Sequence, residues 1–85
     1  HLKSEDDIAA YLALVLEDGD PAPLAATLGD IARARNMAQL ARDTGMTREG
    51  LYKALSGQGN PSLATIMKVM KALGLRLSVA PAAHA

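Results

Sequence analysis

Apolar residues recur along the chain with the three- and four-residue spacing of amphipathic helices. The first such segment spans about residues 5–18, with Ser4 placed to cap it and Gly19 to end it. Its apolar positions form a single stripe, made of Ile8, Tyr11, Leu12, Val15 and Leu16. The spacing therefore predicts a helix that buries one face along its length.

A second helix is predicted to begin at Asp20 and Pro21, because aspartate caps free amides and proline favours the first helical position. It is expected to continue to about Arg35, with a buried stripe of Leu24, Leu28, Ile31 and Ala32. Gly29 lies inside this helix, where glycine costs about 1 kcal/mol relative to alanine. We therefore expect a neighbouring element to need the space beside Gly29.

Three shorter helices follow. The first covers about Ala38–Thr44, and Gly45 after it can take the left-handed backbone conformation that a tight helix end needs. Thr47 is placed to cap the next helix, which continues to about Ser56. After a loop of Gly, Gln, Asn and Pro residues, Ser62 caps the last helix and Gly74 ends it. Its apolar stripe consists of Leu63, Ile66, Met67, Met70 and Leu73.

Residues 75–80 alternate apolar and polar side chains with a period of two, and Pro81 follows. This alternation predicts a short, half-buried β-strand. A lone strand in a helical domain would leave its amides and carbonyls unpaired, so we expect it to pair with another chain, either a second copy in a dimer or the edge of a partner protein's sheet. The 85 residues are thus predicted to form one all-α domain of five helices over 4–80, with this C-terminal β-strand and a frayed tail at 81–85.

The composition limits the residue types that can form the core and excludes several classes of function. Hydrophobic residues make up 49% of the chain but aromatic residues only 2%, which predicts an aliphatic core. The chain has no cysteine and only two histidines, one near each end, which excludes thiolate zinc sites and histidine-based catalysis. Because the chain offers no nucleophile–base pair and no metal-binding cluster, we expect a non-enzymatic protein without metal or cofactor. No apolar run is long enough to span a bilayer, so we expect a cytoplasmic location. The methionines are expected to fill the core: Met37, Met46, Met67 and Met70.

The formal net charge of zero hides a strong asymmetry along the chain. Residues 1–30 carry seven acidic side chains against one lysine, a charge of −6, and residues 31–85 carry eight basic against two acidic ones, a charge of +6. Such a distribution indicates that the later part meets a polyanion. The alternative is that acids gather at helix beginnings and bases at helix ends because the helix dipole favours them there. Arg33 and Arg35 fit both explanations, as helix-end charges or as phosphate contacts.

Residues 37–56 have the pattern of a helix-turn-helix motif. Leu40 and the small Ala41 belong beneath the second helix, and Gly45 makes the turn. The second helix is expected to turn Leu51, Ala54 and Leu55 inward, with Met46 filling the corner.

The outer face of the second helix then carries side chains able to reach base edges and phosphates from the major groove. These candidate DNA-binding residues are Thr47, Arg48, Glu49, Tyr52, Lys53 and Ser56, together with Gln39, which is expected near the phosphate backbone. Each has a structural alternative: a solvated face, a ring packed on the domain surface for Tyr52, or a favourable dipole for Glu49. Gly50 leaves three explanations open: a close helix, close DNA or a tolerated soft helix.

The run from Leu28 to Gly57 resembles the addiction-module antidote proteins, which are HigA-like antitoxins of the Xre, or lambda-repressor-like, helix-turn-helix superfamily. The segments 60–65 and 71–75 are also similar, and the resemblance extends from Ile8 to Pro81. It implies a homodimer that binds double-stranded operator DNA, represses its own operon and neutralises a RelE/ParE-like toxin. Asn36 departs from the pattern, standing where a glycine is expected.

The alternatives are a free-standing Xre-family regulator and a protein-binding module that does not bind DNA. If the partner is a toxin that handles RNA, it is expected to be basic and to attract the acidic first helix. The acidic residues concerned are Glu5, Asp6, Asp7, Glu17 and Asp18. The predicted strand at 75–80 is the other candidate for this contact, through the edge of the toxin's sheet.

Overall fold

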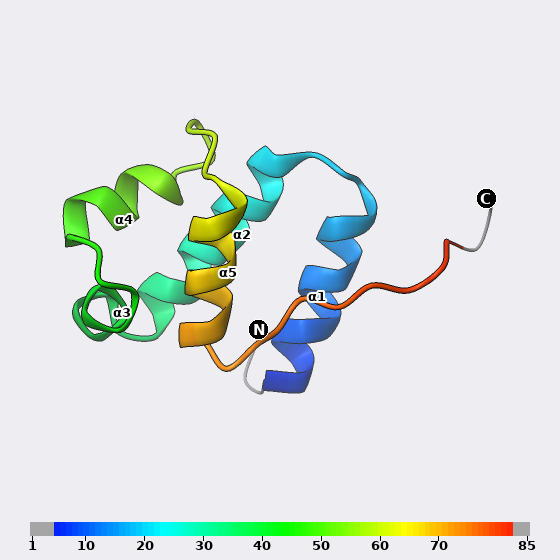
Figure 1. Cartoon of the computed structure of the whole chain (residues 1–85), viewed down its shortest axis with the longest axis horizontal. Helices are drawn as coiled ribbons and strands as arrows, with labels where there is room; N and C mark the ends of the chain where they lie inside the picture. Colours follow the sequence, from blue (N-terminus) through cyan, green and yellow to red (C-terminus); the bar gives the residue numbers. More distant parts are fainter. Residues whose placement is uncertain (1–4, 83–85) are drawn as a thin grey trace.

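The computed structural model describes residues 5–82, which form five α-helices and no strand (Figure 1). The helices are α1 (Glu5–Glu17), α2 (Pro21–Ala34), α3 (Met37–Thr44), α4 (Arg48–Ala54) and α5 (Leu63–Ala72). The five predicted helices are therefore confirmed, with small differences at their ends. The cap predicted at Ser4 lies outside the described residues, and so do residues 83–85 of the predicted tail.

The helix ends follow from local side-chain chemistry. The side chains of Asp20, Thr47 and Ser62 each accept a hydrogen bond from a backbone amide in the first turn of the helix that follows, as predicted. At the other end of α5, Gly74 adopts a left-handed conformation with φ of 81°. The Leu75 amide then donates to the Met70 carbonyl at 2.8 Å, which closes the helix.

The core is aliphatic, as the composition predicts. Helix α3 packs against α2, α4 and α5, α2 also packs against α5, and α1 is held mainly by α2. The largest fully buried side chains come from four helices and the end of α4: Leu12, Leu28, Leu51, Leu55 and Val69. In Figure 1, α3 and α4 lie toward one end of the long axis and α1 toward the other.

Gly29 is the contact point between α2 and the end of α4. A Cβ added at this position would overlap the carbonyl oxygen of Leu55 and crowd its Cβ. The expectation that a neighbouring element needs the space beside Gly29 is confirmed, and the neighbour is backbone, which cannot rotate away. The glycine therefore lets α4 sit close to α2.

The apolar stripes of α1 and α5 are only partly buried, which corrects the sequence-based prediction. In α1 the buried residues are Ile8 and Leu12, whereas Tyr11 and Leu16 are exposed. In α5 Leu63 and Met67 are exposed, so Met67 is not core filler, and Val69 is buried instead. Met37 and Met70 are buried as expected, and Met46 packs against the core from its edge. The stripes are wider than the core of a domain this small can cover.

The C-terminal β-strand predicted at 75–80 is absent. Residues 75–82 have no regular secondary structure and pass alongside α1 (Figure 1). Beyond Leu75, no backbone hydrogen bond joins the described part of this segment to another element. Alternating side chains are compatible with any extended segment, but a strand needs a second backbone to pair with, and residues 5–82 offer none.

Candidate nucleic-acid interface

Helices α3 and α4 form a helix-turn-helix whose turn is held by the backbone. Gly45 has a φ of 73°, and its amide donates to the Arg42 carbonyl at 3.3 Å. The next amide, that of Met46, donates to the Ala41 carbonyl at 3.1 Å. The buried hydroxyl of Thr44 donates to the Leu40 carbonyl at 2.8 Å, so the last turn of α3 is satisfied internally. The direction in which α4 leaves α3 is thereby fixed.

The inner face of α4 is buried as the motif predicts. Leu51 and Leu55 are inaccessible to solvent, and they meet Leu40 and Ala41 of α3 in the core. Ala54 is half-buried. Because the inner face is anchored by fully buried leucines, the outer face of α4 is presented in one orientation.

The start of α4 is capped by a residue that also faces solvent. The Thr47 hydroxyl accepts a hydrogen bond from the Gly50 amide at 3.0 Å, while the residue as a whole is exposed. A Cβ added at Gly50 would meet this hydroxyl at 3.0 Å and otherwise only the tip of Met46. Within the described residues no helix backbone crowds Gly50, which removes the neighbouring-helix explanation for this glycine.

The outer face of α4 gathers the predicted residues on the surface. Thr47, Arg48, Glu49, Tyr52, Lys53 and Ser56 are all exposed. Among residues 5–82 neither Arg48 nor Lys53 has an ion-pair partner, so both cationic groups are uncompensated. The Ser56 hydroxyl, by contrast, donates to the Lys53 carbonyl at 3.0 Å and accepts from the Gln58 amide at 3.2 Å. Ser56 thus closes the end of α4 with both of these contacts.

Arg33 of α2 joins this face, which sequence spacing does not reveal. Its guanidinium lies 5.8 Å from the centroid of the Tyr52 ring and 3.1 Å from a carboxylate oxygen of Asp30. A cation over an aromatic face is a favourable contact. The contact with Arg33 therefore holds the half-exposed ring of Tyr52 close to α2. The pair is 19 positions apart in sequence, and only the close approach of α4 at Gly29 brings it together.

Gln39 lies on the exposed side of α3 in a small polar network. Its amide nitrogen donates to Asp43 at 2.8 Å, and its amide oxygen accepts from Arg42 Nη2 at 2.7 Å. The network places the positive group of Arg42 next to Gln39, and both side chains are exposed. Arg42 is a further cation near the motif that the sequence-based list of candidates omits.

A family model described as "Probable addiction module antidote protein" matches residues 1–81. The chain belongs to this family. A protein of Haemophilus influenzae is 60% identical over 79 residues, covering 93% of this chain and 81% of the relative, and is described as an uncharacterized protein. No solved structure matches the chain.

Membership of the antidote family gives the chain an antitoxin role, with a toxin as its partner. The described part of this antidote protein contains no helix long and apolar enough to cross a membrane. It also brings no group of three or more histidine, aspartate or glutamate side chains together in a way that could hold a metal ion.

Asn36 of the antidote protein stands where a glycine is expected, and its hydrogen bonds account for the asparagine. Its side-chain oxygen accepts a hydrogen bond from the Gln39 amide at 3.1 Å, and its carbonyl accepts from the Leu40 amide at 2.9 Å. Asn36 is therefore the N-cap of α3, for which asparagine is among the preferred residues. Its extended backbone, with φ of −155°, needs no glycine.

Asn36→Ala is expected to lower the free energy of unfolding by about 1 kcal/mol, because one amide of α3 loses its partner. Asn36→Asp keeps the acceptor and should stay close to the parent. Urea unfolding followed by circular dichroism measures both. Equal stability of Asn36→Ala and the parent would show that this cap contributes nothing to the motif.

Proposed function

We propose that this antidote protein is a HigA-like antitoxin of the Xre superfamily that binds operator DNA through α3 and α4 and represses its own operon. In the same proposal it neutralises a RelE/ParE-like toxin. The observation that carries the DNA-binding part is the outer face of α4, where Arg48 and Lys53 are exposed and unpaired above a fully buried inner face. Uncompensated cations on a rigid, exposed helix suit a polyanion with a groove of helix width.

In this mechanism α4 enters the major groove with its first turn toward the bases. Arg48 is the first residue of the helix, where helix-turn-helix proteins reach base edges, and its fork of donors suits the two acceptors of guanine. Thr47 and Glu49 flank it and are assigned to the same edges. Lys53, on the last turn, is assigned to phosphate.

The second group of contacts lies beside α4. The amides at the start of α3, with Gln39, are assigned to the phosphate backbone, where a helix N-terminus favours negative charge. Arg33, held over Tyr52 and paired with Asp30, is assigned to the edge of this surface on the α2 side. Ser56 is assigned to the edge of the site, since its hydroxyl already serves the helix end.

The functional form is proposed to be a homodimer. Two copies related by a two-fold axis present two α4 helices to successive major grooves, about 34–36 Å apart along the duplex. The operator is then a palindrome in the DNA upstream of the protein's own gene.

The antitoxin role is tested at the gene's own locus, where the proposal expects a small, basic open reading frame beside the gene, and by co-expressing the product of that reading frame with the antidote protein. The proposal expects the adjacent protein to arrest growth when expressed alone, and the antidote protein to restore growth and co-purify with it. An adjacent product that neither arrests growth nor binds the antidote protein would contradict a RelE/ParE-like toxin at this locus.

Lys53→Ala is expected to weaken binding to operator and to random duplex alike, because a phosphate contact carries no sequence information. The slope of log K against log salt concentration should fall in magnitude by about one. Binding isotherms at several salt concentrations measure this, with Lys53→Arg as the matched control that keeps the charge and the slope. An unchanged slope for Lys53→Ala would place Lys53 away from the phosphates.

A further inference from the structure

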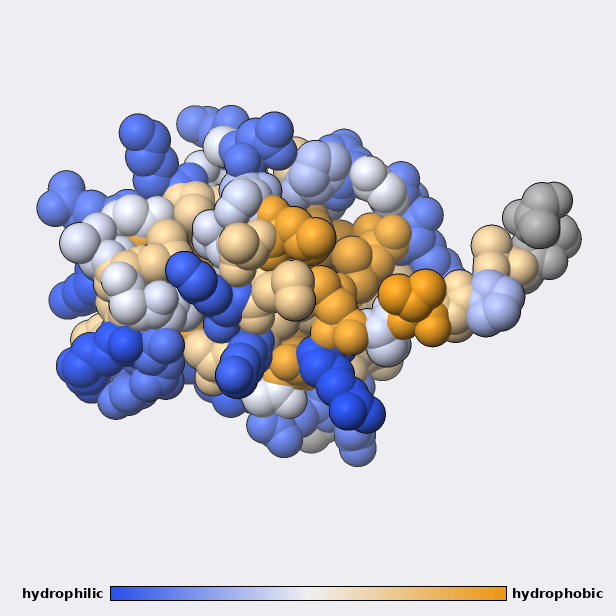
Figure 2. Space-filling model, viewed as in Figure 1, coloured by the Kyte–Doolittle hydropathy of each residue, from blue (hydrophilic) through white to orange (hydrophobic). Residues whose placement is uncertain are grey.

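The large apolar side chains left on the surface are concentrated at the end of the molecule away from α4. Of the eight exposed large hydrophobic residues among 5–82, five lie on α1 or on the C-terminal segment 75–82: Tyr11, Leu14, Leu16, Leu77 and Val79. Val79 is 99% exposed and Leu14 65%. Figure 2 shows apolar side chains gathered in the middle of the face crossed by this segment. A concentration of this kind is typical of an interaction surface.

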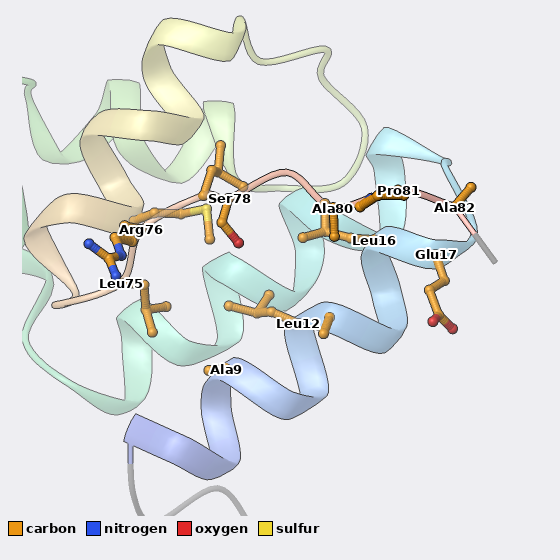
Figure 3. A pocket seen from close by; sticks show the side chains of 13 residues that line it. Ala9, Leu12, Leu16, Glu17, Leu75, Arg76, Ser78, Ala80, Pro81 and Ala82 are labelled. Carbon is orange, nitrogen blue, oxygen red and sulfur yellow. The ribbon is translucent and has the colours of Figure 1, made fainter.

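The C-terminal segment forms a ridge between two hollows. On one side a groove of about 870 Å³ separates it from α1, lined mostly by apolar side chains such as Leu12, Leu16 and Ala80 (Figure 3). On its other side a smaller hollow lies against α5 and is lined by Met67 and Leu77, among others. The groove and the ridge have the shapes that allow one such surface to interlock with a second one.

The two flanks of this ridge carry opposite charges. Residues 5–18, on the α1 flank, hold five acidic side chains and no basic one, and Glu17 lines the groove. Residues 63–82, on the α5 flank, hold three basic side chains and no acidic one: Lys68, Lys71 and Arg76. All three line the smaller hollow, and Arg76, which lies on the ridge itself, also lines the groove. Among residues 5–82 no ion pair joins the acidic flank to the basic flank.

We propose that this surface is the homodimer interface and that its occupant is a second copy of the chain. In a two-fold contact the same patch meets itself, so the surface must be self-complementary. An apolar ridge with acid on one flank and base on the other meets this condition, because the acidic flank of each copy faces the basic flank of its partner. The ridge of one copy, with Leu77 and Val79, packs into the groove of the other. This inference rests on the homodimer of the proposed function and identifies the surface that forms it.

The proposed interface leaves the candidate DNA-binding face free. Helix α4 lies toward the opposite end of the long axis from α1 (Figure 1). A toxin seated on the ridge and groove is the competing occupant, and it predicts that the antidote protein alone is a monomer.

The test is sedimentation equilibrium of the full chain at low salt, without DNA or toxin, on the parent and two charge variants. One variant reverses the acidic flank, with Glu17→Lys and Asp18→Lys, and the other reverses the basic flank, with Lys68→Glu and Arg76→Glu. The parent should be a dimer, and each variant alone should dissociate at least roughly tenfold more readily, because like charges then face each other. Mixed in equal amounts, the two variants should recover the parent's dimer mass as a heterodimer.

A second pair of variants tests the apolar contact without risk to the fold. Val79→Glu changes a side chain that is 99% exposed, so the monomer should keep its circular dichroism spectrum while the dimer is lost. Leu63→Glu is the matched control, since Leu63 is 66% exposed and lines neither hollow, and it should dimerise as the parent does.

A monomeric parent, charge variants that dimerise like the parent, a mixture that stays monomeric, or an unaffected Val79→Glu dimer would each overturn the proposal. Because no DNA is present, these outcomes leave the assignment of α4 to DNA intact. Conversely, loss of operator binding on substitution in α4 does not change the sedimentation result.

Discussion

Arg48→Ala is expected to weaken binding to the operator by about 1–3 kcal/mol and to relax the base preference at one position of the half-site. Arg48 begins α4, is exposed, and has no ion-pair partner among the described residues, so its guanidinium is available for a base edge. Removing it should cost little on random duplex, because a base contact is made only at the right sequence.

Isotherms on operator and scrambled duplexes at matched salt measure this effect. Lys53→Ala is the informative comparison, since it is expected to weaken both duplexes equally. The melting temperature of Arg48→Ala should stay close to that of the parent, because exposed side chains outside a network contribute little to stability. Operator affinity equal to the parent's would show that Arg48 does not read a base.

Gly29→Ala is expected to lower the free energy of unfolding by about 2 kcal/mol, which is the largest stability effect predicted for a single methyl group here. The added Cβ overlaps the Leu55 carbonyl, and relief requires α4 to move away from α2. This loss outweighs the gain of about 1 kcal/mol that alanine brings to a helix interior. Since α4 carries the candidate DNA-binding face, the same substitution should also weaken operator binding.

Ala10→Gly calibrates the helix-propensity contribution. Ala10 is exposed on α1, and glycine there should cost about 0.5–1 kcal/mol through propensity alone. Urea unfolding of both variants separates packing from propensity. A Gly29→Ala protein more stable than the parent would mean that the contact between α2 and α4 is loose enough to absorb a methyl group.

Local signals in the sequence predict most of this fold. The caps at Asp20, Thr47 and Ser62 and the helix-ending Gly45 act within one turn of their own helix, so a single chain reveals them. The inner face of the motif also follows from spacing, because a short helix between polar turns has one way to bury its leucines. Asn36 belongs to the same class of signal, and its capping role can be inferred from its position before α3.

Contacts between residues far apart in the sequence, and the burial that depends on them, could not be predicted from the pattern of apolar positions. The contact of Arg33 with Tyr52 exists because α4 approaches α2 at Gly29; the glycine predicts a close neighbour but does not identify it as α4. The strand at 75–80 was wrong because alternation describes an extended segment, while pairing requires a second backbone. Tyr11 and Leu16 match the helical period and are nonetheless exposed. Periodicity identifies the apolar face of a helix, but it does not show whether that face is buried within the domain or against another molecule. The DNA contacts assigned to the outer face of α4 stay a prediction.

Recognition of DNA by α3 and α4 is tested by an amide NMR titration of the protein with the DNA upstream of its own gene. The largest chemical-shift changes are expected at Gln39 and residues 47–56, with smaller changes at Arg33, while the amide signals of α1 should not move. A scrambled duplex at the same salt should give weaker changes in the same region. Changes confined to α1 and the C-terminal segment, or none on α4 at saturating operator, would contradict a helix-turn-helix that reads DNA.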